Sequence, residues 1–290
     1  MANVLPNGKV ALVEGSVDIG GTRTSISQQF AEELGISITD ILPHVADTDS
    51  IGFTSNTGGS SVTFKSGFAA YQAALDVKKQ IIERAAITWE ASSDEIIYRD
   101  GGVHHLSKPE LSLTFTDVAK DANQTGGPIV GRANVTSTGA ARAYAAMIVD
   151  VSVDPETGKT TILRCTAFQD AGKAIHPSYV EGQIQGGAVQ GIGWALNEEY
   201  FMSGDGHMVN ATLLDYRMPV ANDLPMIEPV IVEVPNPGHP YGVRGVGEAG
   251  IVPPLAAVAN AVSRAIGVRM MDLPMSPGAV SGKIMSPAEV

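Results

Sequence analysis

The chain has 290 residues, 44% of them hydrophobic, so it is long enough for one large globular domain or two smaller ones. Nineteen basic residues against thirty-one acidic ones give a net charge of −12, which offers no basic surface to nucleic acid or to an anionic membrane. The single cysteine, Cys165, excludes an internal disulfide and cannot alone hold an iron–sulfur cluster, which needs about four thiolate or imidazole ligands.

The first residues, MANVLPNGKVALVEG, lack a basic region followed by a long apolar run. No segment suggests a membrane span, which needs about 18 to 20 consecutive apolar residues. We therefore expect a cytoplasmic protein with neither nucleic-acid nor membrane partners.

Short β-rich segments alternate with amphipathic helical ones along the first 110 residues. The first predicted helix has Ile26, Phe30 and Leu34 on one face and stops at Gly35. The predicted elements are, in order, a strand over 9–19, a turn at Gly20-Gly21, a helix over 23–36, a polar loop over 52–64, a helix over 66–86 and a hairpin over 95–106.

A polar stretch over 120–139 is the expected linker, which divides the chain into domains over 1–125 and 140–290. No repeat with a period of about 20 to 50 residues is present, so the chain is not a solenoid or a propeller. The elements predicted after the linker are two strands joined by the turn PETGK, a helix opening at Pro177, a strand over 228–234, a helix over 255–267 and the segment VRMMDL over 268–273.

The helical segment over 176–201 contains five interior glycines, each of which costs a helix about 1 kcal/mol relative to alanine. Two interpretations stay open. The glycines allow either a close approach of the backbone to a ligand or tight packing of the helix on another element.

The segment 245–250, GVGEAG, fits the G-x-G-x-x-G pattern of a dinucleotide-binding turn. Three features oppose a nucleotide-dependent dehydrogenase. A proline-rich loop separates the pattern from the preceding strand, Pro253 and Pro254 place the helix start after the third glycine, and Glu248 would set a carboxylate beside the pyrophosphate.

Glu248 lies between Gly247 and Ala249, which give its side chain little steric cover. Such a carboxylate suits a general base in a cleft, with a pKa raised by partial burial. The alternative is a glutamate near the positive end of the following helix, a common surface role.

Four segments in this order and spacing resemble those of the molybdenum hydroxylases, the family of xanthine dehydrogenase, aldehyde oxidase, carbon monoxide dehydrogenase and nicotinate dehydrogenase. A fifth, LLDYRMPVANDLP (213–225), fits the same pattern. The four are VEGSVDIGGTRTSISQQFAEELGI (13–36), SNTGGSSVTFKSGFAA (55–70), DAGKAIHPSYVEGQIQGGAVQGIGWALNEEY (170–200) and GVRGVGEAGIVPPLAAVANAV (242–262).

The resemblance covers nearly the whole chain and implies an α+β fold of two similar sheet-and-helix subdomains. It also implies a molybdopterin that carries molybdenum, as the cytosine dinucleotide, without a protein ligand to the metal. The resemblance indicates three groups of cofactor-binding residues, with Gly247 in addition. Two groups lie ahead of predicted helices and offer donors to the anionic pyrophosphate and the pterin: Gly20, Gly21 and Thr22, and then Gly59, Ser60, Ser61 and Thr63. In the third, the Gln183 amide would contact the pterin edge, and Gly186 and Gly187 would let the backbone approach closely.

By the same resemblance, Glu248 is the general base of an oxidative hydroxylation that takes its oxygen from water, with a small aldehyde or N-heterocycle as substrate. The electrons would leave through a partner subunit with two 2Fe-2S clusters and one with FAD, since this chain has a single cysteine.

Two departures from the family pattern stand out. Gly21 occupies a turn position where many relatives have glutamine, so Arg23 is a candidate replacement for that contact. The chain also begins where the family's large subunit is half complete, which implies that another molybdopterin-binding chain or segment supplies the rest of the site. The alternative is a non-catalytic scaffold fragment.

Two histidines and the cysteine are not expected to act in chemistry. His104 and His105 are adjacent in a strand pattern and point to opposite faces, which argues against joint metal ligation and suggests surface residues. Cys165 lies in a strand pattern and is predicted to be a small core residue.

Overall fold

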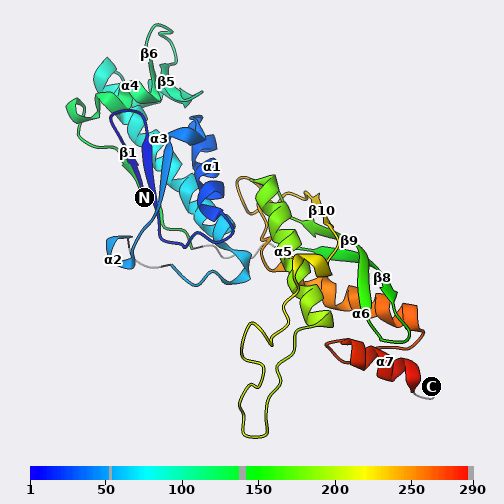
Figure 1. Cartoon of the computed structure of the whole chain (residues 1–290). Coiled ribbons are helices and arrows are strands. Elements are labelled where there is room, and N and C mark those ends of the chain that lie inside the picture. Colours follow the sequence, from blue (N-terminus) through cyan, green and yellow to red (C-terminus); the bar gives the residue numbers. More distant parts are fainter. Residues whose placement is uncertain (52–53, 137–141, 287–290) are drawn as a thin grey trace. The chain divides into compact units, whose positions relative to one another are not determined.

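The structure is a computed structural model that describes residues 1–51, 54–136 and 142–286. Within these residues the chain forms two units, each with a sheet and two long helices packed on each other (Figure 1). The mixture of sheet and helix in both units confirms the predicted α+β class.

Unit 1 comprises Met1–Ala141 and Pro235–Val243, and unit 2 comprises Arg142–Val234 and Arg244–Val290. The segment 235–243 thus belongs to unit 1, although its neighbours in sequence belong to unit 2. The assignment of 1–125 and 140–290 as separate cofactor-binding subdomains stays a prediction.

Unit 1 contains a sheet of order β3-β2-β1-β7, in which only β2 and β3 are parallel, and an antiparallel sheet of order β4-β5-β6. Its strands are β1 (Ala2–Val4), β2 (Val10–Glu14), β3 (Ile41–Val45), β4 (Ile96–Arg99), β5 (Gly102–His105), β6 (Ser112–Thr114) and β7 (Val130–Gly131). Its helices are α1 (Thr22–Leu34), α2 (Thr48–Ile51), α3 (Val62–Trp89) and α4 (Phe115–Lys120), with short 3₁₀ turns η1 (Ile38–Asp40), η2 (Gly58–Ser60), η3 (Ser93–Glu95) and η4 (Ala122–Gln124).

Helix α1 follows the predicted apolar pattern. Ile26, Phe30 and Leu34 lie one turn apart and are all buried. The helix ends at Gly35, whose φ of 62° is the left-handed conformation that glycine adopts at helix ends, and the Gly35 N–H donates to the Glu32 carbonyl. The predicted stop signal is therefore confirmed.

The predicted hairpin is also present, with β4 and β5 joined by a two-residue turn. Asp100 and Gly101 have φ values of 50° and 71°, as a two-residue hairpin with two positive-φ positions requires.

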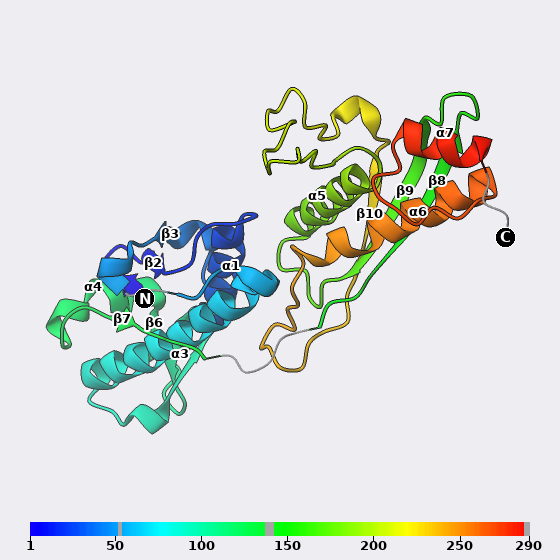
Figure 2. The same cartoon turned by 90° about the horizontal axis from the view of Figure 1, so that it is seen from below.

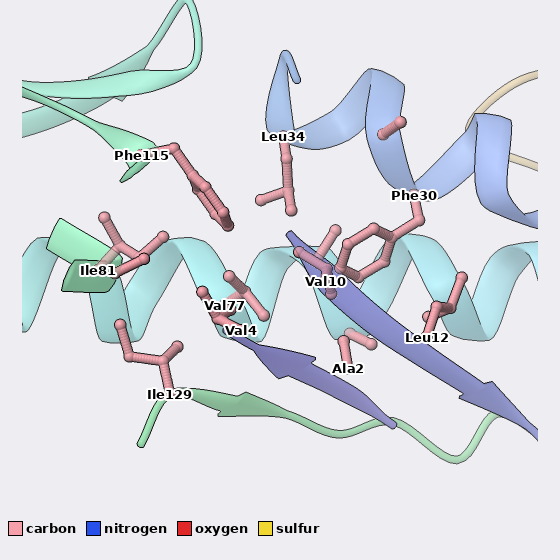
Figure 3. Packing of buried hydrophobic residues seen from close by; sticks show 14 of the residues in the cluster. Ala2, Val4, Val10, Leu12, Phe30, Leu34, Val77, Ile81, Phe115 and Ile129 are labelled. Atoms are coloured by element: carbon pink, nitrogen blue, oxygen red, sulfur yellow. The ribbon is translucent and has the colours of Figure 1, made fainter. Parts of the chain in front are cut away.

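The core of unit 1 collects side chains from both ends of its sequence. Figure 3 shows Val4 and Val10, which are paired across β1 and β2, in one cluster with Phe30 of α1 and Val77 of α3. Ile129, from just before β7, closes the same cluster. Burial of this apolar surface, at about 25 cal/mol per Å², is the main force that holds the two helices on the sheet.

Unit 2 is built on a sheet of order β10-β9-β8, in which β8 and β9 are antiparallel and β9 and β10 are parallel. Helices α5 and α6 pack on each other and on this sheet, as Figure 2 shows. The elements are β8 (Ala145–Val153), β9 (Thr160–Asp170), α5 (Pro177–Leu196), η5 (Ala221–Asp223), β10 (Ile227–Val232), η6 (Ala249–Ile251), α6 (Val252–Ile266) and α7 (Pro277–Met285).

The structure differs from the predicted elements at four places. β2 ends at Glu14, short of the expected strand over 9–19, and α3 begins four residues before its expected start. The expected linker contains β7, which pairs with β1, and its residues 137–139 lie outside the described residues. Helix α7 was not predicted, although Ser276 caps its start and Pro277 occupies its first turn.

One segment, Ala249–Ile266, is long and apolar enough by length and composition to cross a membrane, contrary to the expectation from sequence. A core helix of a globular unit passes the same test. Val258 and Val262 of this segment are buried in the core of unit 2, so the finding supports a membrane span only weakly.

Candidate functional site

The first predicted anion site is the turn 20–22 ahead of α1. Its two glycines have left-handed φ values of 60° and 78°. The Thr22 N–H donates to the Ile19 carbonyl at 3.2 Å, and the Arg23 N–H donates to the Asp18 carboxylate at 3.0 Å. Arg23 also pairs with Asp18 through its guanidinium, again at 3.0 Å. The Asp18 carboxylate therefore occupies part of this helix start. It also pairs with Arg23, the side chain that was expected to replace a cofactor contact.

The second predicted anion site, ahead of α3, is more open. Gly59 has a φ of 70°, and Ser61 precedes the helix without a side-chain cap. The Ser61 hydroxyl donates to the Gly58 carbonyl at 3.0 Å, which leaves its oxygen able to accept. The N–H groups of a first helical turn have no partner inside their own helix and carry a partial positive charge. Thr63 lies in this first turn.

A cleft of about 640 Å³ opens beside the start of α3. Asn56, Ser61, Lys65 and Ser66 line it, so it offers hydroxyl, amide and ammonium donors. The volume falls within the range of about 300 to 1,000 Å³ that is usual for small-molecule sites. Of the two predicted anion sites, this one has the donors and the space that a phosphate group needs.

Glu14 also lines the cleft and is only 8% exposed. Ser16 donates to one of its carboxylate oxygens at 3.4 Å, and Ser66 donates to the Ser16 hydroxyl at 3.0 Å. The other carboxylate oxygen is buried without a hydrogen-bond partner. Burial raises the pKa of Glu14 from 4.5 to about 7, so near neutral pH the carboxyl is only partly charged.

The two helix starts lie at one end of unit 1. The Gln29 side chain of α1 donates to the Thr63 carbonyl at 3.1 Å, and further along both helices Glu33 pairs with Lys78 at 2.6 Å. Since the contacts advance in the same direction along both helices, α1 and α3 run roughly parallel.

The segment 235–243 supports the start of α3. His239 is buried and accepts the Tyr241 N–H at Nδ1, at 3.1 Å, so its Nε2 is assigned the proton that it donates to the Phe64 carbonyl at 3.2 Å. Burial lowers the pKa of His239 to about 4, which keeps the ring neutral at pH 7.

In unit 2 the glycines of α5 divide into two groups. A Cβ on Gly187 would lie 2.8 Å from the Gly250 carbonyl carbon, and one on Gly191 would lie 2.6 Å from the Pro254 side chain. A Cβ on Gly182 or Gly186 would meet no heavy atom within 4 Å. Gly187 and Gly191 thus serve packing on the segment after Glu248, and only the second group leaves space for a ligand.

Gln183 lies on α5 one turn before Gly187 and is half-buried. No hydrogen bond to its side-chain amide is found among the described residues. Its neighbour Gln185 instead donates to the Ile227 carbonyl at 3.1 Å. The predicted pterin-contacting amide is therefore available to a ligand.

Gly247 and Glu248 are exposed and immediately precede η6, which leads into α6. The partial burial expected for Glu248 is therefore not provided by the described residues of unit 2. The Glu248 side chain does not cap η6, which weakens the helix-capping interpretation. Because Gly250 lies against the Ile184 backbone of α5, the Glu248 loop and the Gln183 turn lie in the same part of unit 2.

The two histidines of the hairpin are not surface residues as predicted. His105 is 4% exposed, lies 6.4 Å from the Trp89 ring and accepts the Ser107 N–H, because α3 covers that face of the hairpin. His104 is half-buried and bonds Ser112 at 3.0 Å.

Cys165 is fully buried in the core of unit 2, and burial raises the pKa of its thiol to about 11, as suits a packing residue. Across the described ranges, no group of three or more His, Cys, Asp or Glu side chains is arranged to hold a metal ion.

Comparison with known proteins identifies the family. A family described as "Molybdopterin cofactor-binding domain" matches residues 1–225. The chain belongs to this family, which is found in the xanthine dehydrogenases and aldehyde oxidoreductases. Glu248 lies beyond the matched residues.

Two curated relatives of this molybdopterin-binding chain show the range of the family. The xanthine dehydrogenase molybdenum-binding subunit of Escherichia coli O157:H7 is 34% identical over 93% of this chain and 37% of its own length. The gamma subunit of the 6-hydroxypseudooxynicotine dehydrogenase complex of Paenarthrobacter nicotinovorans is 32% identical over 93% of this chain and 35% of its own length.

Solved structures show the same fold. A Cu,Mo-containing CO dehydrogenase gives a TM-score of 0.87 at 26% identity, over 97% of this chain and 36% of its own. Quinoline 2-oxidoreductase from Pseudomonas putida 86 gives 0.85 at 29% identity, over 98% of this chain and 38% of its own. The chain thus spans little more than a third of the length of these relatives.

The residues present fit a molybdopterin. Within unit 1, the polar cleft at the uncapped start of α3 suits phosphate groups. Within unit 2, the Gln183 amide can bond a pterin edge, and Gly186 leaves room for a close approach. Sequence reasoning missed Glu14 and His239. A lone glutamate at a strand end and a histidine in a proline-rich loop carry no local signal of burial.

Proposed function

We propose that this chain forms part of the cofactor-binding catalytic site of a molybdenum hydroxylase. The reaction proposed is oxidative hydroxylation of a small aldehyde or N-heterocycle, with water as the oxygen source. The observation that carries the proposal is the polar cleft at the open start of α3, in a chain whose family binds molybdopterin. The relatives' names support this class, since they include xanthine and aldehyde oxidoreductases.

The chain's own residues would divide the work. Backbone amides and hydroxyls at 59–63 would hold the phosphate groups, with Lys65 nearby as a cation. Gln183 would orient the pterin, and Glu248 would accept the proton released when the oxygen nucleophile forms. The bound cofactor would supply a centre that accepts two electrons from the substrate.

We propose that the cofactor is the cytosine dinucleotide form, which the resemblance of the sequence motifs to the molybdenum hydroxylases implies. The electrons require an outlet, and this chain has one buried cysteine and no metal-binding cluster among its described residues. We therefore propose partner subunits with 2Fe-2S clusters and with FAD.

The remaining part of the molybdopterin site is proposed to lie on another chain or segment. Residues 197–226 leave α5 as a long excursion from unit 2 that contains only one short 3₁₀ turn (Figure 1). Leu213, Leu214 and Met226 on this excursion are more than 80% exposed. Apolar side chains gathered in this way indicate a surface that a partner covers, and the other molybdopterin-binding part is the partner proposed.

The test of the function is Glu248→Gln in the native complex. We expect kcat to fall by roughly 100-fold or more, because general base catalysis contributes about that much, while molybdenum content stays unchanged. Glu156→Gln, which alters an exposed glutamate in the turn between β8 and β9, is the matched control and keeps full activity. Full activity of Glu248→Gln would refute its role as base.

The alternative, a scaffold that holds a partner without catalysis, predicts a different result. It predicts a complex of normal composition that contains no molybdenum. The open start of α3 and the available Gln183 amide support cofactor binding over a scaffold that holds only a partner, because such a scaffold requires neither. A non-catalytic fragment that holds the cofactor would need both, and the Glu248→Gln test separates it from the catalytic proposal.

A further inference from the structure

Two polar residues at the end of β9 are buried beside the Glu248 loop. Gln169 is 1% exposed and Asp170 is 7% exposed. Buried polar side chains are costly unless they make hydrogen bonds, so the partners of these two residues indicate what they do.

Gln169 binds the Glu248 loop directly. Its Nε2 donates to the Val246 carbonyl at 2.8 Å, two residues before Glu248. Its Oε1 is buried without a hydrogen-bond partner, and a Cβ on Gly250 would lie 3.5 Å from it. The buried Gln169 amide thus contacts the loop on both sides of Glu248. It donates to Val246 before Glu248 and lies close to Gly250 after it.

Asp170 fixes the start of the same loop. One of its oxygens pairs with the Arg244 Nε at 3.1 Å, and the two side chains are only 8% and 14% exposed. The other oxygen accepts the N–H groups of Gly172 and Val234. A nearly buried ion pair with further hydrogen bonds is rigid, because loss of either partner leaves an uncompensated charge.

Arg244 is held at three further points. Its N–H donates to the Ala171 carbonyl at 3.1 Å, and its side chain donates to the carbonyls of Val234 and Arg142 at 2.9 and 2.7 Å. The chain therefore enters the loop at a fixed position. It leaves at Gly250, which packs on Gly187 of α5.

We infer that Gln169 and Asp170 are positioning residues, which hold loop 244–250 so that the exposed Glu248 carboxylate has a fixed place. The importance for catalysis rests on the proposed function of Glu248. The restraint on the loop does not, since it follows from contacts that lie within unit 2.

The test is hydrogen exchange of loop 244–250 in the full chain, compared between the unmodified protein and Gln169→Met. Methionine keeps the length and volume of the side chain but removes the donor to Val246. Exchange in the loop should be roughly fivefold to tenfold faster, as expected for loss of one buried hydrogen bond, while exchange in α6 stays the same. Unchanged exchange in the loop would overturn the inference.

Gln185→Met is the matched control, because it removes a similar bond to the Ile227 carbonyl in the same unit without touching the loop. It should leave exchange in 244–250 unchanged. If Gln169→Met does not fold, Asp170→Asn replaces it, since it keeps the side-chain size and removes the charge that pairs with Arg244.

The catalytic part is tested in the native complex. Gln169→Met should lower kcat roughly tenfold with KM within about twofold, because a displaced base slows chemistry more than substrate binding. Faster loop exchange with unchanged kcat would overturn the link to catalysis alone. Full activity of Glu248→Gln would instead refute the proposed function, while the exchange result would still decide whether the loop is held.

Discussion

Glu14 is a buried carboxyl group at the end of β2. Burial raises its pKa from 4.5 to about 7, so the folded chain keeps a proton that the unfolded chain has already lost between these pH values. The free energy of unfolding should therefore fall as pH rises from 4.5 to 7. In Glu14→Gln this fall is removed, so the free energy of unfolding of the variant, relative to that of the unmodified chain, should rise by about 3 kcal/mol between pH 4.5 and 8.

Urea denaturation between pH 4.5 and 8 measures this difference. Glu110→Gln, at an exposed position of unit 1, is the control and should follow the unmodified chain at every pH. Identical pH dependence of Glu14→Gln and the unmodified chain would show that the Glu14 carboxyl is not buried as described.

At the scale of elements, the fit between α5 and the start of α6 depends on Gly187. A Cβ there would lie 2.8 Å from the Gly250 backbone, so Gly187→Ala should destabilise unit 2 by about 1 to 3 kcal/mol. Gly186→Ala is the matched control. It adds a Cβ into open space within a helix and should stabilise the chain by about 0.5 to 1 kcal/mol.

Thermal denaturation of both variants measures this contrast, and equal effects would contradict the packing described. Gly186→Ala has a second use in the native complex. If the pterin approaches Gly186 as predicted, the variant should retain less cofactor even though its fold is more stable.

Local patterns predicted the elements whose partners are near in sequence. The spacing of Ile26, Phe30 and Leu34 specified α1 and its buried face, and Asp100-Gly101 specified a hairpin turn. Strand β7 was missed because it is only two residues long and its partner, β1, lies about 130 residues earlier. His105 was misplaced for a different reason: α3 packs over the hairpin and brings Trp89 against it, a contact that the strand pattern alone does not show.

The candidate site was predicted by resemblance more than by local physics. From local physics alone a helix cap was the favoured role of Glu248, and nothing ranked the two predicted groups of cofactor-binding residues at 20–22 and 59–63. The structure distinguishes them through Asp18, which occupies the start of α1 while α3 stays uncapped. Gln169 and Arg244 had no signal, because their roles depend on contacts between β9 and a loop about 75 residues later.

At the scale of the whole molecule, the chain is just over a third of the length of its relatives and exposes an apolar excursion over 197–226. The proposed partner, another molybdopterin-binding part, would cover the exposed apolar side chains of this excursion. Residues 235–243 belong to unit 1, although the chain before and after them belongs to unit 2. Unit 1 therefore includes residues from this late part of the sequence, and the Glu248 loop of unit 2 begins directly after them.

The central claim is that this chain holds a molybdopterin in a catalytic complex. The most direct test is elemental molybdenum analysis of the gently isolated native complex, with mass-spectrometric identification of the cofactor and of the copurifying chains. We predict about one molybdenum per copy, since the proposed site holds one cofactor, with a pterin dinucleotide and with iron–sulfur and flavin partners. A complex without molybdenum and without partners, from cells able to make the cofactor, would contradict the claim.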